Sequence, residues 1–197
     1  ASINSFQEYQ QVLQALLSKA GQLQLPKPWH LLGQSTGGAI ALDYLLAQQP
    51  LTEFGQTILL APLVRPRAWQ QSKLLYQLLK PFRSSVPRRF SDNSNDPAFV
   101  EFVRNDPLQA QVLPTAWVGA LAQWIPHIEQ AKRSQRSPII VQGDADMTVD
   151  WQYNLNVLTE KFSEPRILLL PEARHHLVNE QQSIREQYFK FIGEQLN

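Results

Sequence analysis

Apolar residues along this chain recur at two spacings, and each spacing predicts a different kind of element. Helical spacing, in which apolar residues return every three or four positions, marks residues 5–21, residues 37 to a point before Pro50, residues 151–162 and residues 182–192. Short continuous apolar runs of buried-strand length stand at 29–32, 57–61, 139–142 and 166–170. Strands that alternate with helices and are apolar on both faces predict an α/β fold, with a mostly parallel sheet covered by helices on both sides.

The segment from residue 63 to residue 135 interrupts this alternation. It holds helical patterns separated by polar links with prolines, such as 91–97, and no convincing strand. We therefore expect a helical cap at 63–135, inserted between two parts of the core, 1–62 and 136–197. Four aromatic residues of this cap could line a site for an acyl chain or simply pack the cap on the core: Trp69, Phe82, Trp117 and Trp124.

Composition limits the classes of protein that remain. A length of 197 residues with 43% hydrophobic residues is enough for one domain with a sizeable core. A net charge of +1 gives no field that would gather nucleic acid, and the longest apolar run, 58–64, is too short to span a bilayer. The absence of cysteine excludes disulfides, thiol catalysis and cysteine–zinc sites, and it fits a reducing compartment. We expect a cytoplasmic protein that acts on a small molecule.

Basic residues gather only in the middle of the chain. We interpret this group as the solvated face of a helical segment. Contact with lipid headgroups at a membrane surface is the less favoured interpretation. The group consists of Arg65, Arg67, Lys73, Lys80, Arg83, Arg88 and Arg89.

The sequence Gly33-Gln34-Ser35-Thr36-Gly37 matches the G-x-S-x-G pattern of a nucleophile elbow. It follows a predicted strand and precedes a predicted helix, which is the context that gives this short pattern meaning. We expect Ser35 to adopt a strained backbone conformation, and we expect side chains two residues to either side to clash. The N–H of Thr36 would then point towards the place where an oxyanion forms. A phosphate-binding loop does not fit, because the required Gly at Ser35 and the Gly-Lys pair are missing, so no cofactor is expected.

A serine is a poor nucleophile unless a base and an orienting acid stand beside it. In this kind of fold both follow the serine in the chain, each at the carboxyl end of a later strand. Three aspartates follow the strand at 139–142, and two adjacent histidines follow the strand at 166–170. Chemistry alone leaves the choice open among Asp144, Asp146 and Asp150, and between His175 and His176.

Three segments resemble the monoacylglycerol lipase and lysophospholipase branch of the α/β-hydrolases. Residues 31–39 (LLGQSTGGA) resemble the elbow LLGHSMGGA of that branch, and residues 142–146 (QGDAD) resemble its acid segment QGxxD. Residues 173–180 (ARHHLVNE) are similar to its base segment AxHxLxxE, and residues 105–108 (NDPL) resemble a stretch of its cap. The resemblance implies a catalytic triad of Ser35, Asp146 and His175, with Thr36 in the oxyanion hole.

The resemblance also implies a reaction. A protein of this branch would hydrolyse carboxylic esters of lipid-like alcohols, such as monoacylglycerols or lysophospholipids, through an acyl-enzyme on Ser35. Two alternatives stay open. The same triad serves aminopeptidases and hydrolases of small esters, and a protein of this fold can be a non-catalytic scaffold that binds a partner.

Strands expected before the elbow are missing from this sequence. We count four strands where the fold has about eight, and the first donor of the oxyanion hole would lie among the missing ones. We therefore expect the chain alone to hydrolyse esters poorly. We also expect the strand that follows Trp29 to have a flank that is open, or paired with a second copy, a separate N-terminal segment or a rearranged segment.

Overall fold

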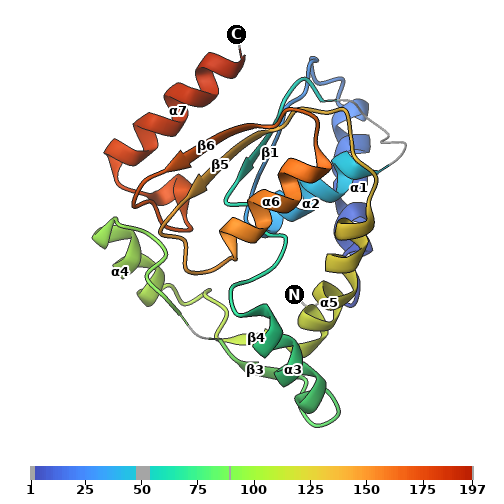
Figure 1. Cartoon of the computed structure of the whole chain (residues 1–197), viewed down its shortest axis with the longest axis vertical. Coiled ribbons are helices and arrows are strands. Elements are labelled where there is room, and N and C mark those ends of the chain that lie inside the picture. Colours follow the sequence, from blue (N-terminus) through green and yellow to red (C-terminus); the bar gives the residue numbers. More distant parts are fainter. Residues whose placement is uncertain (1–2, 48–53, 89, 197) are drawn as a thin grey trace.

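The structure, a computed structural model, describes residues 3–47, 54–88 and 90–196 and contains a four-stranded parallel sheet. Its strands are β1 (Leu31–Gln34), β2 (Thr57–Leu60), β5 (Ile139–Gly143) and β6 (Arg166–Leu170), in the spatial order β1-β2-β5-β6. All three neighbouring pairs are parallel, so their carboxyl ends meet at one edge (Figure 1). The predicted α/β fold with a parallel sheet is confirmed.

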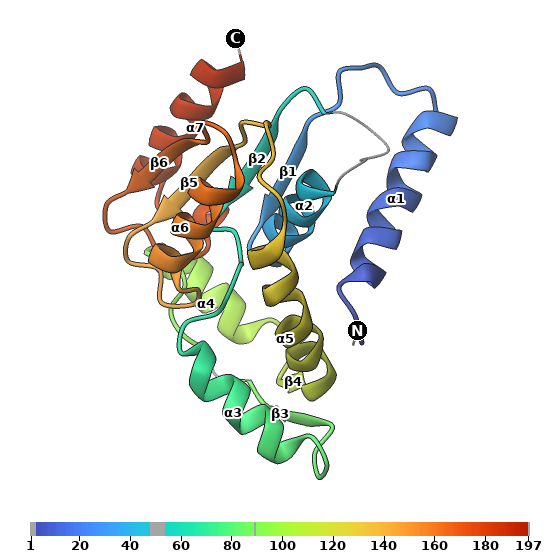
Figure 2. The ribbon, with the colours of Figure 1, turned by 45° about the vertical axis from the view of Figure 1, so that its right-hand side comes forward.

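Helices cover both faces of this sheet (Figure 2). The helices α1 (Gln7–Gln22), α2 (Thr36–Leu46) and α6 (Trp151–Lys161) lie on one side, and α7 (Gln182–Leu196) lies on the other. Successive residues of β5 show why its sequence is continuously apolar. Ile140 packs in the core on the α2 side, whereas Ile139 and Val141 pack in the core on the α7 side.

Two predicted boundaries need correction. The first strand begins at Leu31, two residues later than predicted, and it continues through Gln34 directly into the turn that carries Ser35. The last helix extends to Leu196, beyond the predicted end at Ile192. The helix expected to end before Pro50 ends at Leu46, and residues 48–53 lie outside the described part of the chain.

Residues 63–135 form three helices and, against expectation, a small antiparallel sheet. The helices are α3 (Trp69–Leu79), α4 (Pro97–Asn105) and α5 (Thr115–Gln130), and the strands are β3 (Ser85–Pro87) and β4 (Val112–Pro114). The prediction that this segment holds no strand was wrong. Each strand has only three residues and ends in a proline, which is too short for the alternation of apolar and polar residues that reveals a strand.

The elements of residues 63–135 do not all lie on the same side of the sheet. α3, α4, β3 and β4 lie beyond one end of the sheet in both views (Figures 1 and 2). α5 instead packs in the main core, where Leu121, Trp124 and Ile128 share one cluster with Leu42 of α2. Two of the aromatic residues considered for an acyl site, Trp69 and Trp124, are buried in that cluster, whereas the side chain of Phe82 is 81% exposed.

Strand β1 forms the edge of the sheet and pairs only with β2 among the described residues. Its residue Leu32 is 55% exposed, which is unusual for a leucine in a strand of a parallel sheet. The backbone N–H of Leu31 bonds to Gln56 and that of Ser35 bonds to Leu60, so the alternate groups at Leu32 and Gln34 face away from β2. No strand of residues 3–47, 54–88 or 90–196 pairs with this flank of β1, and its pairing with a second copy or a separate segment stays a prediction.

A stacked aromatic pair helps to hold the start of α1 against the core. Phe6 is 3% exposed and its ring stacks on Trp124 of α5 at 4.4 Å. We expect Phe6→Ala to lower the free energy of unfolding by about 3 kcal/mol, because it removes a buried ring and leaves a cavity. The control is Val12→Ala on the same helix, where the side chain is 69% exposed and the loss should stay below about 0.5 kcal/mol. Urea unfolding of both variants measures this, and equal losses would contradict the assigned packing.

Candidate active site

Ser35 stands in a sharp turn between β1 and α2. Its backbone has φ 54° and ψ −116°, a region that residues with a side chain seldom adopt. Three backbone hydrogen bonds hold it there. Its N–H donates to the carbonyl of Leu60 at 2.9 Å, and its carbonyl accepts from Ala39 at 3.0 Å and from Leu63 at 3.1 Å. The turn is thus fixed by the helix it opens and by the segment that ends β2.

The glycines that this turn requires differ in part from the prediction. A Cβ at Gly33 would lie 2.3 Å from the carbonyl oxygen of Gly37, so Gly33 is required as expected. A Cβ at Gly37 would meet nothing within 4 Å, and the predicted clash there is wrong. The second close contact belongs to Gly38, where a Cβ would lie 3.0 Å from Pro62. Gly37 takes part through its backbone, which is the surface that Gly33 approaches.

His175 lies between Ser35 and Asp146. Its Nε2 is 2.8 Å from Oγ of Ser35, and its Nδ1 is 2.8 Å from Oδ2 of Asp146. His175 and Asp146 are both buried, each with 3% exposure. The structure therefore brings together the three side chains named from the sequence, with His175 between the hydroxyl and the carboxylate.

Asp146 is held by four donors. Its Oδ2 accepts from His175 and from the side-chain amide of Gln142, and its Oδ1 accepts from the N–H groups of Thr148 and Val149. Burial raises the pKa of Asp146, but the bonds and charge of His175 and the two N–H donors outweigh burial, so this pKa lies below its usual value. The carboxylate is therefore ionised at neutral pH.

The other two aspartates have different partners. Oδ1 of Asp144 accepts from the N–H of Glu172, at an exposed site. Asp150 caps α6 and forms an ion pair with Arg65 at 2.6 Å. Neither Asp144 nor Asp150 bonds to a histidine. Of the three aspartates that the sequence left open as the triad acid, only Asp146 does so.

The ring of His176 contacts Gln34 and Phe99, and no hydrogen bond joins it to Ser35 among the described residues. Its Nδ1 lies 3.4 Å from Nε2 of Gln34, and its ring packs against Phe99 of α4 at 5.2 Å between centroids. The backbone N–H of His176 donates to the carbonyl of Asn93. Burial first, and then the electrostatic interactions with His175 and Arg88, lower the pKa of His176 against the opposing charge of Asp146, so its ring is neutral at pH 7.

Two residues that sequence reasoning assigned no role position the site. A Cβ at Gly143 would lie 2.2 Å from the carbonyl oxygen of Ala173, because the loop that carries Asp146 and the loop that carries His175 touch there. Glu180 is fully buried and accepts from the N–H groups of Arg174 and Asn95, so it ties the histidine loop to the segment before α4. The last position of the base segment was a signal for Glu180, but its partners are far away in the sequence.

Thr36 is the first residue of α2. The first N–H groups of a helix have no acceptor within it, so that of Thr36 is available to a negative oxygen beside Ser35. The expectation of a donor at this position therefore agrees with where the helix begins.

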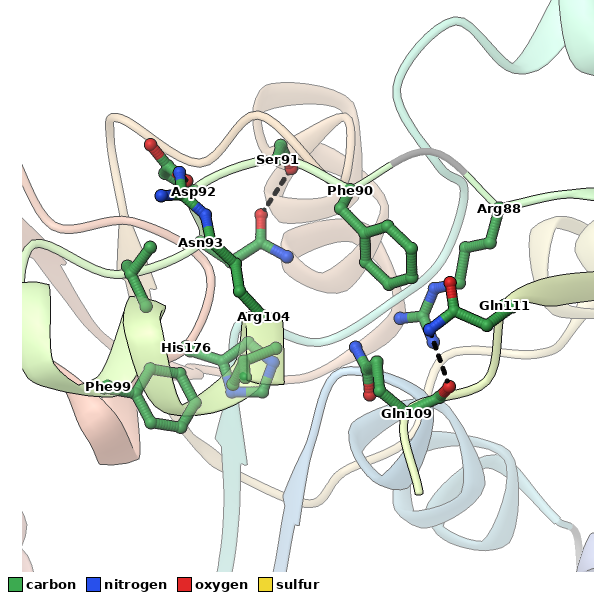
Figure 3. Close-up of a pocket in the computed structure, with 12 residues that line it drawn as sticks. Arg88, Phe90, Ser91, Asp92, Asn93, Phe99, Arg104, Gln109, Gln111 and His176 are labelled. Atoms are coloured by element: carbon green, nitrogen blue, oxygen red, sulfur yellow. Dashed lines mark hydrogen bonds and ion pairs between the residues drawn. The ribbon is translucent and has the colours of Figure 1, made fainter. Parts of the chain in front are cut away.

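A pocket of about 270 Å³ lies beside His176, which is one of its lining residues (Figure 3). Phe90, Phe99 and Val103 give it an apolar part, and Arg88, Gln109 and Gln111 give it a polar part. None of the four cap aromatics considered for an acyl site lines it. No helix among the described residues is long and apolar enough to cross a membrane.

The parallel sheet, the strand–serine–helix elbow and the acid and histidine loops at one edge define this protein as an α/β-hydrolase. A family model described as "Serine aminopeptidase, S33" matches residues 1–182. The chain belongs to that family. No curated protein matches it.

Solved structures share this fold at low sequence identity. A soluble variant of monoglyceride lipase from Saccharomyces cerevisiae has a TM-score of 0.78 at 18% identity, over 98% of this chain and 68% of that one. Monoacylglycerol lipase from Paleococcus ferrophilus has a TM-score of 0.79 at 18% identity, over 98% and 75%. A carboxyl esterase from Bacillus coagulans has a TM-score of 0.69 at 17% identity, over 95% and 71%. The predicted resemblance to the monoacylglycerol lipase-like branch of the α/β-hydrolases is confirmed.

The two glycines of the elbow pattern give a matched test of its geometry. We expect Gly33→Ala to lower the free energy of unfolding by about 2 kcal/mol or more, because the added methyl group would meet backbone that cannot move aside. Gly37→Ala should leave it unchanged or raise it by up to about 1 kcal/mol, because alanine favours a helix and the space is open. Thermal and urea unfolding measure both, and a large loss from Gly37→Ala would contradict the structure of the turn.

Proposed function

We propose that this protein is a serine hydrolase that cleaves carboxylic esters of lipid-like alcohols, such as monoacylglycerols or lysophospholipids. One observation carries the proposal. Ser35, His175 and Asp146 form an unbroken line of two 2.8 Å contacts at the edge of the sheet where the elbow lies. Such a line turns a weak hydroxyl nucleophile into a strong one.

The protonation states follow from the contacts. The ionised Asp146 can only accept, so Nδ1 of His175 donates to it, and Nε2 is left to accept the proton of Ser35. Oγ of Ser35 attacks the ester carbonyl while Nε2 takes its proton. The tetrahedral oxyanion collapses, the C–O bond of the ester breaks, and His175 returns the proton to the leaving alcohol. A water molecule then hydrolyses the acyl group from Ser35 by the same transfers and releases the acid.

The oxyanion of each step would accept a hydrogen bond from the N–H of Thr36 at the start of α2. Removing one such donor from an enzyme of this kind costs about 10²–10³ in rate. Residues 63–135 would act as the cap that covers the site, because His176 packs on Phe99 of α4 and bonds to Asn93. The names of the solved structures, two lipases for monoacylglycerols and an esterase, support the choice of substrate.

An aminopeptidase is the alternative that the family name suggests. A peptide substrate would present a free ammonium group close to the triad, and an acidic pocket would be needed to bind it. In the pocket beside His176, the carboxylate of Asp92 already pairs with Arg104 at 2.7 Å. Ester hydrolysis is therefore the better supported function.

The adjacent histidines give the sharpest test of this proposal. We expect His175→Ala to lower kcat/KM for a short ester by at least about 10³-fold, and Ser35→Ala to abolish labelling by a fluorophosphonate probe. His176→Ala is the matched control and should change kcat/KM by less than about tenfold, since His175 and not His176 bonds to Ser35 and Asp146. Similar losses from both histidine variants would refute the assignment of the base.

We further propose that the protein associates with membrane surfaces through α3. Three leucines of this helix, Leu74, Leu75 and Leu78, are more than half exposed, and Phe82 follows them. Residues 54–91 contain no Asp or Glu, whereas the basic residues of the middle of the chain all lie there. An exposed apolar face on a segment that is only positively charged suits an anionic lipid surface.

Vesicle binding tests this association. We expect the double variant Leu74→Gln, Leu78→Gln to bind vesicles that contain phosphatidylserine at least tenfold more weakly, because two apolar side chains no longer enter the interface. The matched control, Val12→Gln with Leu16→Gln, changes two exposed apolar residues of α1 and should bind as the unchanged protein does. Binding to neutral vesicles with equal strength would show that the positive charge plays no part.

A further inference from the structure

The pocket beside His176 contains two arginines, and only one of them has an acidic partner (Figure 3). Arg104 of α4 donates to Oδ1 of Asp92 at 2.7 Å, so these two charges cancel. The guanidinium of Arg88 forms no ion pair with any carboxylate of the described residues. With His176 neutral, the charge of the pocket is therefore positive, and Arg88 carries it.

Arg88 is held in place from both ends. Its N–H donates to the carbonyl of Gln111 at 2.9 Å, which continues the pairing of β3 with β4 beyond Pro87. Its guanidinium lies over the ring of Phe90 at 5.5 Å, an arrangement that attracts a cation. In Figure 3 it lies beside the amide of Gln111, across the pocket from His176. The guanidinium of Arg88, which lines the cavity, can therefore donate to a ligand bound there.

The pocket is close to the candidate nucleophile. The rings of His175 and His176 lie 5.9 Å apart between centroids, and Nε2 of His175 is in contact with Ser35. The charge of Arg88 reaches His176, since it is one of the causes that lower the pKa of that ring. A ligand in this pocket would therefore lie one imidazole ring away from the reacting ester.

We propose that this pocket binds an anionic group, phosphate or carboxylate, on the alcohol part of the ester substrate, with Arg88 as its principal donor. The proposal rests on the proposed ester hydrolysis and narrows its substrate to esters whose alcohol is negatively charged. A guanidinium offers two parallel N–H groups that match two oxygens of a phosphate or a carboxylate. Phe90 and Phe99 would contact the short carbon chain between that anion and the ester.

The charge of Arg88 also determines which groups would bind poorly in this pocket. An ammonium group would be repelled by the positive charge of Arg88, whereas a neutral glycerol would gain no ion pair from it. Arg88 would therefore act on selectivity between substrates, and it would leave the chemical step at Ser35 unchanged.

The first experiment measures binding without turnover. Glycerol 3-phosphate is titrated calorimetrically into the full chain carrying Ser35→Ala, so that no ester bond is needed and none is broken. We expect Arg88→Gln to weaken binding about 10- to 100-fold, and Arg88→Lys to restore part of it. Arg83→Gln is the matched control, because it removes one exposed positive charge that does not line the pocket. Equal binding by the Arg88→Gln and Arg83→Gln variants, or no binding by the parent protein at millimolar ligand, would overturn the proposal.

The second experiment measures selectivity. Three esters with the same acyl chain are compared: one of glycerol 3-phosphate, one of glycerol with a succinyl group, and one of glycerol alone. We expect Arg88→Gln to lower kcat/KM for the charged esters by about 10- to 100-fold, mostly through KM, and for the neutral ester by less than threefold. Whichever charged ester loses more kcat/KM in Arg88→Gln carries the preferred anion, phosphate or carboxylate.

The two proposals fail in different ways. If Ser35 is not labelled by a fluorophosphonate and no ester is cleaved, ester hydrolysis is refuted, while binding of glycerol 3-phosphate through Arg88 would still support the anion site. If Ser35 is labelled and esters are cleaved with equal loss for charged and neutral substrates in Arg88→Gln, the anion site is refuted and the hydrolase stands.

Discussion

The backbone turn at Ser35 is the constraint on which the rest of the site depends. A residue with positive φ at the end of a strand sends the chain back along the sheet as a helix, and its hydroxyl remains at the sheet edge. This reversal is possible only because Gly33 lets the strand touch the backbone of Gly37, and because Gly38 lets the helix approach Pro62. The bonds from Ser35 to Leu60 and Leu63 then fix β2 beside it. The strain of one residue is thus offset by packing against two others.

Parallel strands bring the remaining groups to the same edge. β5 ends before Asp146 and β6 ends before His175, and the contact of Gly143 with Ala173 sets the distance between their loops. Glu180 adds a second restraint, since its carboxylate gathers N–H groups from both the histidine loop and the segment before α4. A buried carboxylate is stable there only while these donors stay in place. Any opening of that segment would therefore disturb the loop that carries His175.

Much of this could be read from the sequence, because the decisive signals are local. Four apolar runs predict the strands of the sheet. The order of serine, acid and base along the chain predicts that all three lie at the carboxyl edge of that sheet. The errors concern contacts made over long separations or by very short elements. The crowding at Gly38 depends on Pro62, and the burial of Trp124 depends on its stacking with Phe6. β3 and β4 have three residues each, too few for any period to show. The pocket at Arg88 is built from four separate segments, residues 88–93, 99–104, 109–111 and His176, and no pattern within any one of them predicts it.

The different contacts of His175 and His176 have a consequence for how mutation can alter the substrate preference of such a protein. Two neighbouring residues of one loop have different partners: His175 bonds to Ser35 and Asp146, whereas His176 lies against Phe99 and Gln34. A mutation at position 176 can therefore reshape what is admitted to the cavity without moving the base. New substrate preferences are open to this scaffold by single steps, each of which keeps the hydrolytic machinery intact. Within this loop, His175 must stay fixed for the reaction, whereas the next residue, His176, can vary.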